Sequence, residues 1–169
     1  MKKLVIAIAL VAILGAGTAF ADNRPSGFGI GVVGAGHSGW TGGGGIGFRY
    51  GLALAAADTY WGIQLAGFGS NLFIGVTGDF LTFMSGSIGG GPVGWYIDGG
   101  LFANVLLGNN LTLGGGARLP IGLSFNFNDF IDIWLAAVPS IGVSVTTGGN
   151  TNIGLGGGWG PEIGLRVWF

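Results

Sequence analysis

Residues 111–127 read LTLGGGARLPIGLSFNF, and the alternation within this stretch decides the fold class. Every odd position is apolar or glycine, whereas the even positions carry glycine, hydroxyl, amide, proline or the charged Arg118. Successive side chains of a β-strand point to opposite faces, so this pattern predicts one strand with an apolar face and a polar face. Such a strand is typical of a transmembrane β-barrel, with lipid on one side and a lumen on the other.

The same period of two recurs along the rest of the chain. It is clearest toward the C-terminus and less regular in the N-terminal half. The pattern predicts an all-β protein, an eight-stranded antiparallel up-and-down transmembrane β-barrel, because single-chain bacterial barrels have an even number of strands. The predicted strands cover residues 28–32, 46–52, 59–68, 71–83, 93–107, 111–127, 131–145 and 152–169.

Two irregularities are expected within these strands. Pro139 has no backbone N–H to donate, so we expect a bulge or a local irregularity at that position. The apolar phase changes at Phe80-Leu81, which indicates a second bulge. The connecting segments are short and rich in turn residues.

The first residues of the chain predict a secretory signal peptide. Lys2 and Lys3 precede an uninterrupted apolar run over residues 4–14, and Ala19 and Ala21 form a small-x-small cleavage site. The apolar run is shorter than the ~20 residues that a membrane-spanning helix needs. We therefore expect residues 1–21 to be a signal peptide that is cleaved after Ala21.

Residues 22–169 are then expected to form a single domain. Cleavage leaves four basic residues against seven acidic ones, a formal net charge of −3. No basic patch is present, so nucleic acid is not an expected partner. Cysteine is absent, which excludes disulfides and thiolate metal sites.

The hydropathy of the chain is unusual for a soluble protein. Charged residues make up 8 % of the chain, against ~25 % in soluble domains, and the mean hydropathy is +0.67. No apolar stretch after the signal approaches the length of a membrane-spanning helix. A closed barrel is the remaining structure that satisfies its backbone in lipid. A soluble β-sandwich is the alternative fold.

The alternation assigns the charged side chains of the strands to the lumen. Opposite charges inside a narrow barrel are expected to pair, because an isolated buried charge is very costly. This predicts an ion-pair network that plugs the lumen of a non-enzymatic structural or surface protein. The inward glycines favour an alternative, a narrow channel for small solutes. The predicted network consists of Arg49, Asp79, Asp98, Arg118, Asp132, Glu162 and Arg166.

A second alternative is a lipid-modifying outer-membrane enzyme, and it rests on His37 and Ser38. Nucleophilic catalysis needs a serine activated by a base that a third group orients. Adjacent residues on a strand point apart, and no carboxylate is evident near this pair. We therefore expect no enzyme activity, no cofactor and, with a single histidine, no metal site.

The terminal residues Leu165-Arg166-Val167-Trp168-Phe169, together with the signal peptide and the alternation, resemble outer-membrane proteins of the OmpX and OmpA-barrel type. The stretches 117–125 and 137–142 are similar to small outer-membrane barrels of spirochaetes. The resemblance implies an integral protein of the bacterial outer membrane, with membrane lipid, periplasmic chaperones and the barrel assembly machinery as partners. It also implies that the outward residues of the last strand serve as the assembly signal, namely Ile163, Leu165, Val167 and Phe169.

Overall fold

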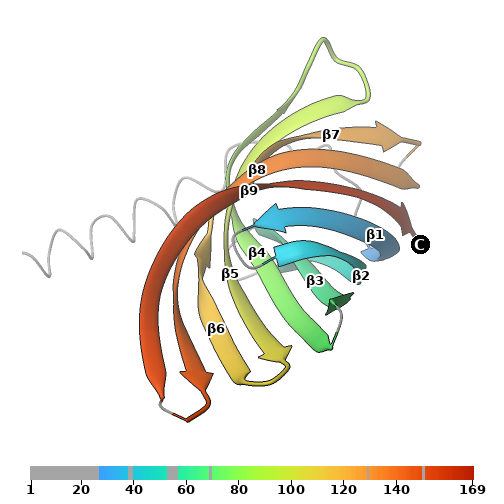
Figure 1. Cartoon of the computed structure of the whole chain (residues 1–169). Coiled ribbons are helices and arrows are strands. Elements are labelled where there is room, and N and C mark those ends of the chain that lie inside the picture. The colour runs from blue at the N-terminus through green and yellow to red at the C-terminus, as the bar shows by residue number, and fades with distance from the viewer. Residues whose placement is uncertain (1–26, 38–39, 53–56, 69, 129, 150) are drawn as a thin grey trace, which may run out of the picture.

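The computed structural model describes residues 27–37, 40–52, 57–68, 70–128, 130–149 and 151–169 (Figure 1). These residues form strands and turns, and they include no helix long and apolar enough to cross a membrane. The strand segments are β1 (Gly27–His37), β2 (Trp40–Leu52), β3 (Ala57–Phe68), β4 (Asn71–Ser87), β5 (Val93–Leu107), β6 (Leu111–Arg118), β7 (Ile121–Phe127), β8 (Ile131–Thr147) and β9 (Asn152–Trp168). The predicted signal peptide, with Ala19 and Ala21, lies outside the described residues.

All of the pairings between these segments are antiparallel. The order is β4-β3-β2-β1-β9-β8-β6-β5-β7, with further pairings of β4 with β5 and of β7 with β8. Segments β6 and β7 follow one another along the same course between β5 and β8, so the nine segments occupy eight strand positions. The prediction of an all-β fold with eight antiparallel strands is confirmed.

The single strand predicted over residues 111–127 is divided at Leu119-Pro120. Pro120 cannot donate a backbone hydrogen bond, but its carbonyl accepts one from the Asp98 N–H at 2.9 Å. The Leu119 N–H donates to the Pro139 carbonyl, also at 2.9 Å. The division is therefore local, and both segments keep their neighbours.

The irregularity predicted at Pro139 is not found in its own strand. Segment β8 runs through this residue, and its pairing with β9 keeps one register from Ile131 to Thr146. The interruption lies instead in the neighbouring strand, at Leu119-Pro120, directly opposite Pro139. Both Pro120 and Pro139 lack a backbone N–H that could donate a hydrogen bond to the neighbouring strand. The strand assignment is interrupted at Pro120 and continues through Pro139.

The bulge predicted at Phe80-Leu81 is confirmed. The register between β4 and β5 shifts between Asp79 and Leu81, and shifts again between Thr82 and Met84. Each inserted residue moves the following side chains to the other face, so the buried positions change phase twice along β4.

The two faces of the sheet differ sharply in polarity. We call the face with buried side chains the inner face; it includes Gln64, Thr77, Tyr96, Asp98, Arg118, Ser124, Asp132, Trp134 and Trp168. The other, outer face carries large exposed apolar side chains, among them Val32, Leu65, Leu101, Leu135, Ile141, Val143, Leu155 and Ile163.

Candidate functional site

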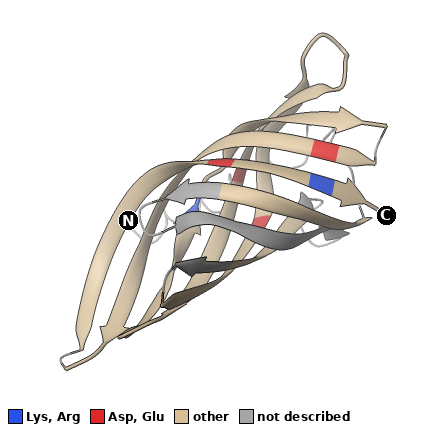
Figure 2. Ribbon diagram, turned by 45° about the vertical axis from the view of Figure 1, so that its right-hand side comes forward, with Lys and Arg blue, Asp and Glu red and all other residues tan. Residues whose placement is uncertain are grey.

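The inner face carries every charged side chain that the structure describes. These are Asp79 on β4, Asp98 on β5, Arg118 on β6, Asp132 on β8, and Glu162 and Arg166 on β9, and each is buried or half-buried. In Figure 2 these charges appear as coloured patches on the strands. Arg49 lies on β2, opposite Gly27 and Tyr60, and its side chain lies outside the described part of the structure.

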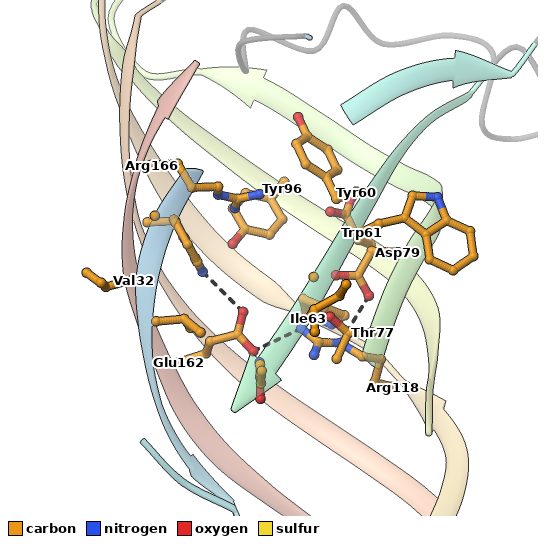
Figure 3. A pocket seen from close by; sticks show the side chains of 17 residues that line it. Val32, Tyr60, Trp61, Ile63, Thr77, Asp79, Tyr96, Arg118, Glu162 and Arg166 are labelled. Carbon is orange, nitrogen blue, oxygen red and sulfur yellow. Dashed lines mark hydrogen bonds and ion pairs between the residues drawn. The ribbon is translucent and has the colours of Figure 1, made fainter. Parts of the chain in front are cut away.

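Arg118 is the centre of this cluster. Its Nε lies 3.0 Å from Asp79 Oδ1, and its Nη2 lies 3.0 Å from Glu162 Oε2. The Arg118 side chain is 6 % exposed, so both ion pairs are shielded from solvent. Dashed lines in Figure 3 mark both of these contacts, among others. Arg118 therefore joins β4, β6 and β9 through side chains alone.

The strand register explains how Asp79 reaches Arg118. Gly100 on β5 pairs with Asp79 on one side and with Arg118 on the other. A Cβ added to Gly100 would overlap the Asp79 carboxylate. The missing side chain thus lets the carboxylate lie across β5 and meet the guanidinium one strand further on.

Glu162 links this ion pair to an aromatic group. The indole Nε1 of Trp134 donates a hydrogen bond to Glu162 Oε1 at 3.1 Å. Trp134 pairs with Gly164 across β8 and β9, and a Cβ on Gly164 would overlap the indole ring. The indole therefore lies over Gly164, and Glu162 bridges Trp134 and Arg118.

Arg166 is surrounded by aromatic rings. Its guanidinium carbon lies 3.7 Å from the centroid of the Trp134 ring, 5.2 Å from that of Trp168 and 5.5 Å from that of Tyr60. Its Nη2 also lies 3.6 Å from Asp132 Oδ2. Such stacking stabilises a cation electrostatically and fixes its position.

These side chains line a partly open cavity with polar walls (Figure 3). The space open to water inside it is about 60 Å³, enough for ordered water at a polar site. Asp98, which is 2 % exposed, contributes to its wall. The other lining residues include Tyr60, Gln64, Thr77, Asp79, Tyr96, Arg118, Glu162 and Arg166.

The structure thus brings together five members of the predicted network in two linked groups. Arg118, Asp79 and Glu162 form one group, and Arg166 and Asp132 form the other. Asp98 lies in the wall of the same cavity. The predicted network omitted the aromatic partners Tyr60, Trp134 and Trp168, although the alternation of their strands places each on the inner face.

The predicted assembly-signal residues lie on the outer face at the end of β9 or just beyond it. Ile163, Leu165 and Phe169 are exposed, and Val167 is half-buried. The Phe169 ring centroid lies 6.5 Å from that of Phe28 and 6.3 Å from that of Phe130.

The enzyme alternative rests on residues that lie largely outside the described part of the structure. His37 ends β1, but its side chain and all of Ser38 lie outside the described residues. Over the described ranges, no group of three or more His, Cys, Asp or Glu side chains is placed to hold a metal ion.

Comparison with known proteins does not identify a relative. No family model matches the chain, and no curated protein and no solved structure is significantly similar to it. The resemblance to the OmpX and OmpA-barrel type and to spirochaete barrels therefore stays a prediction from sequence motifs.

Proposed function

We propose that this protein is an integral outer-membrane β-barrel with a plugged lumen. The plug is the group of contacting side chains Asp79, Arg118, Glu162 and Trp134, which we call the Arg118 cluster. Closure of the sheet is supported by the pairings. The chain of neighbours that runs from β4 through β1, β9, β8 and β6 to β5 returns to β4 through the β4–β5 pairing. A closed sheet leaves no unpaired edge, which is the condition for a β-structure in hydrocarbon.

The observation that carries membrane insertion is the inverted polarity of the two faces. All six described charged side chains lie on the inner face, while the outer face exposes large apolar residues such as Val32 at 62 % and Leu155 at 78 %. A soluble β-sandwich would bury its apolar face against a second sheet. This arrangement fits a sheet with lipid outside and polar groups inside.

Location and assembly follow from the same proposal. A chain with a cleaved signal at residues 1–21 would cross the inner membrane and meet periplasmic chaperones. Its last strand, which ends with Val167, Trp168 and Phe169, would then be read by the barrel assembly machinery. Outer-membrane lipid is the surrounding partner, and no nucleic acid is bound.

The plugged lumen is supported by the number of strands that the Arg118 cluster connects. Asp79, Arg118, Glu162 and Trp134 form a continuous series of contacts from β4 to β8. Inside an eight-stranded barrel the interior is just wide enough for side chains to fill. This series would therefore close the lumen and serve a structural or surface protein that is not an enzyme.

A narrow channel for small solutes is the second candidate. It is supported by the polar cavity and by Gly156 on the inner face, which no side chain covers. A Cβ on Gly156 would have no heavy atom within 4 Å. Water would have room beside this residue.

Single-channel conductance separates the two candidates. The chain from residue 22 onward is refolded, shown to be folded by its heat-dependent gel mobility, and added to planar bilayers. We expect silence from the native chain and discrete steps from Arg118→Ala, with Ser144→Ala as the control that stays silent. Reproducible steps from the native chain would refute the plug and support the channel. Silence from folded Arg118→Ala would show that the Arg118 cluster is not what closes the lumen.

Insertion itself is tested separately, by flotation of the refolded chain with phosphatidylcholine vesicles. Resistance to extraction by alkaline carbonate is expected. Recovery of the folded chain in the soluble fraction would refute the membrane proposal.

A further inference from the structure

The outer face is hollowed at one place by a groove of about 520 Å³. Its volume lies within the range of ligand pockets, roughly 300–1,000 Å³. The groove crosses β5, β7, β8 and β9. Its lining residues are Trp95, Ile97, Ile121, Leu123, Leu135, Ala137, Trp159 and Pro161 on the outer face, with Tyr96, Gly122 and Ala136 beneath.

Small residues between large ones produce this hollow. Ala137 on β8 lies between Ile121 on β7 and Pro161 on β9. The Ala137 side chain is only a methyl group, so the surface is recessed at this position. The Trp159 side chain forms the rim and is 72 % exposed.

One side chain, that of Tyr96, lines both the groove and the polar cavity of the inner face. Gly122 pairs with Tyr96, and a Cβ on Gly122 would lie 2.8 Å from the Tyr96 hydroxyl oxygen. The Tyr96 side chain, 5 % exposed, also lines the polar cavity of the inner face. A single buried ring therefore supports the floor of the groove and closes part of the cavity.

We infer that this groove binds one acyl chain of a membrane lipid. The outer-face lining offers aliphatic and aromatic side chains and no carboxylate, guanidinium or amide. The floor segments β7 and β8 are each hydrogen-bonded to neighbours on both sides, so they have no free backbone edge to receive an added strand. The indole N–H groups of Trp95 and Trp159 are the hydrogen-bonding groups among these outer-face side chains, and the rest of this lining is hydrocarbon. A hydrocarbon chain matches such a surface.

The inference rests on the proposed function, because only an inserted barrel places this face in hydrocarbon. It goes further by distinguishing one site from the rest of the outer face. A chain lodged against the Trp159 rim is expected to exchange more slowly than lipid on the convex parts of the wall.

The test is native mass spectrometry of the chain after refolding in phosphatidylcholine vesicles and transfer to mild detergent. The native protein is expected to retain one phosphatidylcholine. Ala137→Trp fills the groove and is expected to lower the retained fraction about tenfold, equivalent to a 1.4 kcal/mol weaker site. Ala103→Trp is the matched control, since Ala103 is an exposed alanine of the outer face outside the groove, and it is expected to retain the lipid.

A second variant keeps the test decisive if Ala137→Trp does not fold. Trp159→Ala removes the exposed rim and is also expected to lower retention. Unchanged lipid retention in the folded groove variants would overturn the inference. It would also be overturned if the inserted native chain retained no lipid, or if a dimer of the chain were observed in place of the lipid adduct. Failure of the native chain to float with vesicles would overturn the proposed function as well, so the two failures are distinguishable.

Discussion

Gly164 offers the most direct test of how the inner face is packed. A Cβ at this position would overlap Cη2 and Cζ2 of the Trp134 ring and would lie 2.6 Å from its Cζ3, so all three of its nearest atoms belong to that ring. Ordinary carbon contacts are about 3.5–4.0 Å, so Gly164→Ala must displace the ring by well over about 1 Å. The ring cannot simply rise from the sheet, because the Arg166 guanidinium lies 3.7 Å from its centroid.

The expected loss follows from the contacts that the displaced ring gives up. Its hydrogen bond to the Glu162 carboxylate, 3.1 Å long, is of a kind that contributes about 1.5–3 kcal/mol. Stacking of Arg166 on Trp134 contributes about 1 kcal/mol or more when desolvated. Replacing a glycine within a strand returns roughly 0.5–1 kcal/mol of backbone entropy. We expect Gly164→Ala to lower the free energy of unfolding by about 2–3 kcal/mol.

The assay is urea unfolding of the refolded chain in phosphatidylcholine vesicles, followed by tryptophan fluorescence. Gly156→Ala is the matched control on the same strand and face, because its Cβ would meet nothing within 4 Å. It is expected to change the unfolding free energy by less than about 0.5 kcal/mol. In a Trp134→Leu background the Gly164→Ala effect should shrink, giving a coupling energy of about 2 kcal/mol. Equal effects of Gly164→Ala and Gly156→Ala, or no coupling to Trp134, would refute the packing described.

Three further predictions address the ion pairs, the lipid-facing surface and the chain end. Arg118→Met should destabilise the folded chain by about 3–5 kcal/mol in the same assay, because it removes the guanidinium from two carboxylates that are only 13 % and 14 % exposed; neutral replacement of both carboxylates in the same chain should recover part of the loss. Val143→Lys on the outer face should cost about 2–4 kcal/mol in hydrocarbon, whereas Ser144→Lys on the inner face should cost clearly less; equal costs would contradict the assignment of faces. Phe169→Ala should reduce the amount of assembled protein in cells and leave refolding in vesicles unchanged, while Phe127→Ala, also at an exposed outer-face ring, should leave assembly unaffected.

The period of two was sufficient to predict which residues share a face. It needs only the alternation of side chains along one strand, a local property of the backbone. Arg118, Asp132 and Trp134 are buried, and Leu135 and Ile141 are exposed, as their phases require. The change of phase near Phe80 was visible for the same reason.

The sequence did not predict which charged side chains pair with one another. The alternation places Asp79 and Glu162 on the same face as Arg118, but it does not relate positions on different strands. Their meeting depends on register, and on β4 the register itself shifts twice between Asp79 and Met84. It also depends on Gly100, whose role is evident only once Asp79 and Arg118 are known to lie on either side of it. The prediction of an irregularity at Pro139 was wrong because it considered one strand without its neighbour. Segment β8 is continuous at Pro139, and the interruption lies opposite it, at Leu119-Pro120.

The glycines of the inner face divide into two kinds, and this division bears on how the lumen would be closed. Gly100, Gly122 and Gly164 each lie beneath a large or charged side chain from a neighbouring strand, whereas Gly156 toward the β8–β9 hairpin leaves open space. The covered glycines, which favour a plugged lumen, and the uncovered one, which favours a channel, therefore lie in different parts of the molecule. The part of the inner face that is filled by side chains is short along the strands. It depends on the Arg118 guanidinium, which Asp79 and Glu162 share. In a closed barrel, obstruction at that level alone would be enough to stop solutes, which is why a substitution at Arg118 is a sharper test of conduction than any change at the uncovered Gly156.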